Sequence, residues 1–169
     1  MSPVDGVDAA GLIPEFCITP GENLNFAIPT LHLYGGYDPK PGFSGLACAP
    51  EKLSNERFWN ALSPDSHRWS INATEFAHQE YLDEFYRLEN EVTHFCGFNE
   101  DLPKDVYPVF RNFAAGSTVA FFRALFDANC NDYLVYLEDP NLMSVDTTER
   151  HVNPTGACPT PYCTWEPLL

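Results

Sequence analysis

Positively charged residues are scarce in this sequence. Its 169 residues include nine Lys and Arg against 24 Asp and Glu, which gives a formal net charge of −15 at pH 7. Proteins that bind nucleic acid need basic side chains to neutralise phosphates, and anionic membrane surfaces attract the same side chains. The charge therefore excludes a nucleic-acid partner and disfavours binding to an anionic membrane surface.

Long hydrophobic runs are also missing. No stretch approaches the roughly 18 apolar residues that span a bilayer, so the sequence predicts no transmembrane segment. Residues 1–6 lack the basic and apolar regions of a signal peptide and the Arg- and Ser-rich character of a transit peptide. Two interpretations follow: a cytoplasmic protein, or a chain whose natural start lies upstream of Met1.

The six cysteines are too widely spaced for the framework of a small disulfide-rich domain. Only Cys158 and Cys163 are close neighbours, and a local disulfide between them is left open. Their spacing does not match a Cys-x-x-Cys zinc site, and His94 and Cys96 have no third ligand nearby. The sequence predicts neither a metal nor a cofactor.

What is present is an apolar composition typical of one globular domain, with 44% hydrophobic and 14% aromatic residues. Short β-type runs predict two strands, and apolar residues at helical spacing predict three helices. The strands are 27–34 and 68–74, and the helices are 51–62, 109–127 and 131–137. This order is typical of a parallel sheet covered by helices. Two strands are too few for a complete sheet, so either the first residues hold another strand or most of the sheet lies outside this chain.

Two polar side chains follow these strands directly. Asp38 comes after the first strand and a Gly-Gly turn, and His78 comes after the second strand. In α/β hydrolases a serine, an acid and a histidine follow different strand ends in that order, and Asp38 and His78 fit the second and third places. The alternatives are that His78 is an ordinary loop histidine and that Asp38 is a turn residue before a proline.

The first place, the nucleophile, is empty. The Gly-x-Ser-x-Gly turn of these hydrolases does not occur in the sequence. The nearest match surrounds Ser44, but it lacks the second half of the motif and does not lead from a strand into a helix.

Several stretches together resemble chlorophyllase, the ester hydrolase that removes phytol from chlorophyll. Ser-Pro-Val-Asp-Gly at 2–6 resembles that family's Asp-Pro-Val-(Asp/Ala)-Gly segment, and 28–36 resembles its Ile-Pro-x-x-x-x-Gly-x-Gly strand and turn. The Cys-Ala-Pro stretch at 48–58 and the loop Phe-Ala-His-Gln-Glu-Tyr-Leu-Asp at 76–83 are similar to two further motifs. The helix at 111–126 resembles the family's last helix. The resemblance runs from residue 2 to about residue 140 and covers the C-terminal half of such an enzyme.

The resemblance implies that His78 is the catalytic histidine. The family's acid is the first residue of its Asp-Pro-Val segment, where this chain has Ser2. Asp5 or Asp38 would then be the acid, and the strand context favours Asp38. The family's serine motif and oxyanion-hole loop are absent and would lie upstream of Met1.

These observations lead to one expectation of fold and function. We expect an α/β fold in which residues 1–140 form the C-terminal part of an α/β-hydrolase domain with an incomplete sheet, followed by a Pro- and Thr-rich extended tail at 141–169. The resemblance implies a carboxylic ester hydrolase acting on a hydrophobic, chlorophyll-like ester, with the missing N-terminal half of the hydrolase as a partner. It also suggests the chloroplast, with the cytoplasm as the alternative. The alternative function is an inactive, hydrolase-like pigment-binding or interaction protein.

Overall fold

The structure is a computed structural model with one mixed sheet. The described residues are 23–24, 27–43, 45, 47–49, 55–82, 96–127, 129–154 and 159. In this part of the chain three strands pair in the order β1-β2-β3. They are β1 (Thr30–Gly35), β2 (Arg68–Ala73) and β3 (Thr147–Val152).

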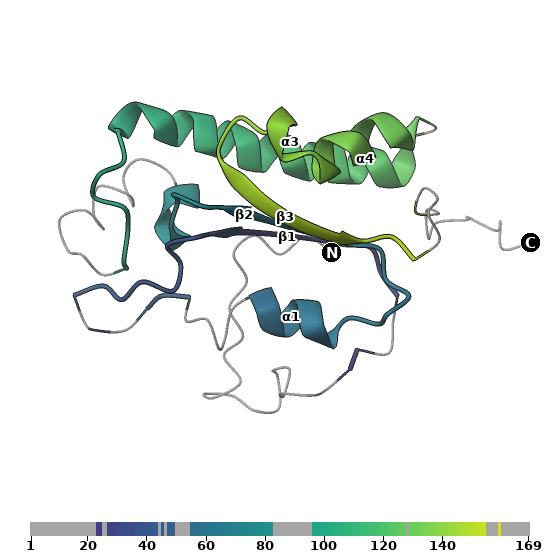
Figure 1. Ribbon diagram of the computed structural model, residues 1–169, viewed down its shortest axis with the longest axis horizontal. Coiled ribbons are helices and arrows are strands. Elements are labelled where there is room, and N and C mark those ends of the chain that lie inside the picture. Colours follow the sequence, from purple (N-terminus) through teal and green to yellow (C-terminus); the bar gives the residue numbers. More distant parts are fainter. Residues whose placement is uncertain are drawn as a thin grey trace, which may run out of the picture.

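Helices lie on both faces of the sheet (Figure 1). One face is covered by α3 (Tyr107–Phe126) and α4 (Cys130–Glu138), and α1 (Asn55–Ala61) lies against the other. Three short 3-10 helices connect these elements: η3 (His78–Tyr81), η4 (Lys104–Val106) and η5 (Pro140–Leu142). Within the described residues, no helix combines the length and apolar character needed to cross a membrane.

Strands β1 and β2 are parallel, with a register that runs from Thr30 opposite Arg68 to Gly35 opposite Ala73. The segment between them contains α1, so the predicted strand-helix-strand pattern is confirmed. Parallel strands end at the same edge of a sheet, and the residues that follow β1 and β2 are therefore neighbours. This edge carries the candidate site.

Strand β3 is the element that the sequence did not predict. It pairs antiparallel with β2, with Val152 opposite Arg68, and lies in the stretch from residue 141 for which the sequence predicts an extended tail. Its sequence, Thr-Thr-Glu-Arg-His-Val, has no apolar alternation because it is an edge strand with only partly buried side chains. Its attachment is polar: Arg150 forms an ion pair with Glu56, and its guanidinium lies 4.2 Å from the centre of the Trp59 ring.

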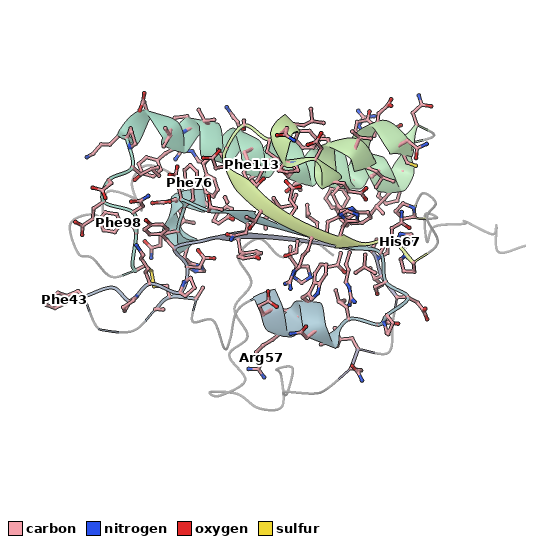
Figure 2. All side chains as sticks on the ribbon, in the orientation of Figure 1. Phe43, Arg57, His67, Phe76, Phe98 and Phe113 are labelled. Carbon is pink, nitrogen blue, oxygen red and sulfur yellow. A yellow bond between two sulfur atoms is a disulfide. The ribbon has the colours of Figure 1, made fainter. Side chains whose placement is uncertain are left out.

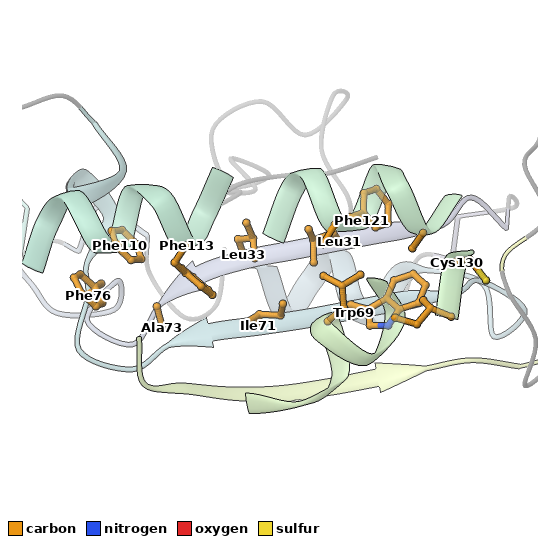
Figure 3. Packing of buried hydrophobic residues seen from close by; sticks show 14 of the residues in the cluster. Leu31, Leu33, Trp69, Ile71, Ala73, Phe76, Phe110, Phe113, Phe121 and Cys130 are labelled. Carbon is orange, nitrogen blue, oxygen red and sulfur yellow. The ribbon is translucent and has the colours of Figure 1, made fainter. Parts of the chain in front are cut away.

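Helix α3 supplies one side of the apolar core (Figure 3). Its buried residues recur at the three- and four-residue spacing of one helix face, as predicted for 109–127. Pro108 lies in the first turn, where its missing N–H is not needed. The buried face of α3 consists of Tyr107, Phe110, Phe113, Ser117, Ala120, Phe121 and Ala124. These residues pack on Leu31, Leu33, Trp69, Ile71 and Ala73 of the sheet.

The other two predicted helices are also present. Residues 131–137 lie within α4, and the second half of 51–62 forms α1, while 51–54 are outside the described residues. The short α4 packs Cys130, Leu134 and Leu137 into the same core.

The core assignment predicts a large difference between two phenylalanines of α3. Phe121 is 0% exposed and packs edge-on against Trp69, whereas Phe126 is 63% exposed. Phe121→Ala is expected to lower the free energy of unfolding by about 3–5 kcal/mol, because it leaves a cavity in the core. Urea titration followed by circular dichroism measures this change.

Phe126→Ala is the matched control, with the same substitution on the same helix, and is expected to change the free energy of unfolding by about 0.5 kcal/mol or less. Equal losses in the two variants would contradict the orientation of α3 on the sheet.

Candidate functional site

The turns that follow β1 and β2 are bonded to each other through their main chains. The Gly36 N–H donates to the Ala73 carbonyl at 2.9 Å, and the Tyr37 N–H donates to the Phe76 carbonyl at the same distance. The two turns thus continue the pairing of the parallel strands beyond their last residues. Any side chain on one turn is held in a fixed position relative to the other.

Gly35 makes this close approach possible. A Cβ atom at this position would lie 2.3 Å from the Phe76 carbonyl oxygen and 2.8 Å from Asp38 Oδ1. Both separations are far below van der Waals contact, so a residue with a side chain would force the turns apart. A glycine at the last position of β1 is therefore a packing requirement of the site.

Asp38 is fixed by the same turn. Its N–H donates to the Gly35 carbonyl at 3.1 Å, and its Oδ2 accepts a hydrogen bond from the Gly35 N–H at 3.0 Å. The side chain is 4% exposed. The sequence thus places a carboxyl group, buried and oriented, directly at the end of β1.

His78 is the first residue of η3, and the residues around it anchor this loop. Phe76 stacks on Phe110 of α3, with ring centres 4.0 Å apart and planes 6° from parallel. The Ala77 N–H donates to Glu80 Oε2 at 2.7 Å, and Glu80 is 2% exposed. The imidazole is therefore presented by a loop that is held at both ends.

The electrostatic setting of His78 combines two opposing effects. Burial lowers its pKa below the usual 6.5, because the charged imidazolium loses hydration. The negative charge of Asp38 acts in the opposite direction and raises the pKa by a smaller amount. At pH 7 the imidazole is therefore mainly neutral and can accept a proton, with a carboxyl group close enough to stabilise the cation that forms.

The structure brings together two of the three predicted site residues. Asp38 and His78 lie close enough to interact electrostatically, and their catalytic roles stay a prediction. Asp5 lies outside the described residues, as does Ser44. Over the described ranges, no group of three or more His, Cys, Asp and Glu side chains is arranged to hold a metal ion.

Sequence reasoning missed a disulfide beside this site. Cys48 and Cys96 are bonded, with Cα atoms 5.4 Å apart although 48 residues separate them. The prediction weighed only cysteines close in sequence, and spacing along a chain carries no information about such long-range pairs. Cys130 is disulfide-bonded as well. The open Cys158–Cys163 pair also lies outside them.

Glu80 was missed too, although a local signal was present. It stands three residues after Ala77, where a carboxylate typically accepts a hydrogen bond from the residue that precedes a helical turn. Asn99 was missed without any such signal. Its Nδ2 donates to the Glu75 carbonyl at 3.3 Å and ties the segment before α3 to the turn after β2.

The opposing effects of burial and of the Asp38 charge predict how the pKa of His78 responds to mutation. We expect a value below 6.5 in the folded protein and a further decrease in Asp38→Asn, because that variant loses the charge that raises it. Asn keeps an oxygen that can accept the Gly35 N–H. Titration of the His78 ring signals by NMR measures both values, and a pKa that rises in Asp38→Asn would contradict the arrangement.

The lowered pKa of His78 also makes the stability of the folded protein depend on pH. A histidine whose pKa is lower in the folded state binds fewer protons there than in the unfolded chain. The contribution of His78 to the free energy of unfolding is therefore fully present above pH 6.5. It is lost as the pH falls toward the lowered pKa of the folded state. His67 is also shifted downward by burial, so His67→Gln and His78→Gln are each expected to flatten the fall in stability below pH 6.5.

Comparison with known proteins shows the family of this chain. Residues 1–152 match the model of the chlorophyllase family. A relative from Citrus unshiu, "Chlorophyllase-1, chloroplastic", is 27% identical over 157 residues, which cover 86% of this chain and 43% of that protein. The chain thus spans less than half the length of this relative, and no solved structure matches it. The family match extends over the parallel strands, both site residues and the long helix, and the chain belongs to the chlorophyllase family.

Proposed function

We propose that this chain contributes the general base and its orienting acid to a serine-type carboxylic ester hydrolase. Family membership supports a hydrolase that acts on a lipophilic ester. The observation that carries the proposal is the pairing of a buried carboxyl group, Asp38, with a mainly neutral imidazole, His78, at the shared end of two parallel strands.

The chemistry assigned to these groups is nucleophilic acyl transfer. A serine oxygen attacks the ester carbonyl while His78 accepts the serine proton. The negative charge of Asp38 stabilises the resulting imidazolium. His78 then passes the proton to the departing alcohol oxygen as the ester C–O bond breaks. Water hydrolyses the acyl-enzyme by the same proton transfers, with His78 first as base and then as acid, which releases the carboxylate and restores the serine.

The serine belongs to a part of the hydrolase beyond these 169 residues. The chain has no Gly-x-Ser-x-Gly motif, and the Citrus unshiu relative is more than twice as long as the stretch it shares with this chain. The substrate that family membership favours is chlorophyll, whose hydrolysis yields chlorophyllide and phytol. The 169-residue chain by itself is expected to show no turnover, because without a nucleophile only weak residual catalysis is left.

A comparison of variants in the full-length gene product tests the proposal. His78→Ala is expected to lower kcat/KM for the release of chlorophyllide from chlorophyll by about 10⁴-fold, and Asp38→Asn by a similar factor, as for other members of serine triads. His151→Ala is the matched control. His151 is an exposed residue of β3 paired with Trp69, and its replacement is expected to leave activity unchanged.

Each other outcome has a specific meaning. Full activity in His78→Ala would contradict the proposal. Activity lost in His78→Ala but retained in Asp38→Asn would reject Asp38 as the acid, and Asp5→Asn would then test the other candidate. Turnover by the 169-residue chain alone would place the nucleophile inside it.

A further inference from the structure

A cavity of about 510 Å³ lies next to the candidate site, between the turn after β1 and the segment before α3. Its volume is within the range typical of small-molecule pockets. The cavity lies at the end of the sheet where β1 and β2 stop, and Figure 2 shows Phe76, Phe98 and Phe43 at that end of the molecule. We call it the turn cavity. It is separate from Asp38 and His78, which do not line it.

The walls of the turn cavity are tied together covalently and by close packing. The Cys48–Cys96 disulfide joins the segment after β1 to the segment before α3, and Cys96 lines the cavity. A Cβ atom on Gly97 would lie 2.4 Å from the Lys40 carbonyl oxygen, so the two walls are in main-chain contact. The cavity is therefore part of the fold and is present before any ligand arrives.

Aromatic rings supply the apolar part of the lining. Tyr37 and Phe43 come from one wall and Phe98 from the other. Ring faces of this kind favour flat, unsaturated groups, which stack on them or meet them edge to face. Phe43 is 89% exposed, which is unusual for a phenylalanine in a monomer and places an apolar ring at the rim.

The charges of the lining disfavour an anionic ligand. Glu100 and Asp101 repel an anion, as does the net charge of −15 of the whole chain. The ammonium group of Lys40 lies 3.4 Å from the centre of the Tyr37 ring, which already stabilises its positive charge. A ligand without negative charge avoids this repulsion.

We propose that the turn cavity binds a flat aromatic or conjugated group that carries no negative charge. The cavity is linked to the catalytic loop at two points: Tyr37 donates its N–H to the Phe76 carbonyl, and Asn99 donates to the Glu75 carbonyl. Two lining residues of the cavity are therefore bonded to main-chain carbonyls that precede His78 by two and three residues. If the proposed function holds, this cavity takes the ring-bearing part of an uncharged ester and disfavours the free carboxylic acid formed by hydrolysis.

Two fluorescent probes of similar shape and different charge test this site without any hydrolysis. N-phenyl-1-naphthylamine is uncharged, and 8-anilinonaphthalene-1-sulfonate is an anion. In titrations of the 169-residue chain we expect the uncharged probe to bind more tightly. Phe98→Ala and Phe43→Ala are each expected to weaken its binding by about three- to tenfold, the range for the loss of one aromatic contact. Because Phe43 is almost fully exposed, its replacement leaves the fold intact.

The matched control is Phe126→Ala on the outer face of α3, where Val119, Phe122 and Phe126 border another hollow. This variant is expected to leave the affinity of the uncharged probe unchanged. If it weakens binding as much as Phe43→Ala and Phe98→Ala do, the probe binds nonspecifically to exposed apolar surface and the proposal is wrong.

The charge argument has its own test. Glu100→Gln combined with Asp101→Asn is expected to tighten binding of the anionic probe and to leave the uncharged probe unaffected. Equal affinity for the two probes in the unmodified chain, with no response to this double substitution, would overturn the assignment of a ligand without negative charge. Probe binding without any ester hydrolysis by the full-length protein would keep the cavity assignment and reject only the proposed function.

Discussion

The main-chain contact between the turns that follow β1 and β2 is the constraint on which the site depends. It brings the Gly35 backbone so close to the Phe76 carbonyl that no Cβ fits between them, and it is sealed by the hydrogen bond from the Tyr37 N–H. Because Asp38 folds back onto Gly35 and His78 follows Phe76 by two residues, this one contact sets the position of both polar groups. The same contact carries Tyr37, which lines the neighbouring cavity.

The long helix determines whether that contact can persist. Phe76 is stacked on Phe110, and Tyr81 at the end of η3 lies 4.7 Å from the same ring. The apolar core of α3 thus reaches the loop that carries His78 directly, and the stability of the core and the order of this loop are coupled. The Cys48–Cys96 disulfide joins the two segments that enclose the turn cavity. An apolar stack therefore holds the loop that carries His78, and a covalent bond holds the walls of the cavity.

Much of this could be predicted from sequence because it rests on local patterns. Apolar runs and helical spacing identified β1, β2 and α3. The positions of Asp38 and His78 after two strands made them the candidate acid and histidine, and the structure brings them close enough to interact electrostatically. Strand β3 could not be predicted, because it is an edge strand without apolar alternation. Its side chains make polar contacts instead, between Arg150 and Glu56 and between Thr148 and Asn72. The disulfide depends on a contact between distant segments, which no local pattern reveals. The place of Asp5 and of the nucleophile depends on parts of the fold beyond the described residues.

Hydrogen exchange of the turn amides, followed residue by residue by NMR, tests the central claim most directly. If the two turns are bonded as the structure shows, the amides of Gly36 and Tyr37 are protected like that of the strand residue Tyr34, because all of them open only when the sheet edge unfolds. Exchange at Gly36 and Tyr37 as fast as in an unstructured peptide, with Tyr34 still protected, would show that the turns are not held together. The account of how Asp38 and His78 are brought close enough to interact would then be wrong.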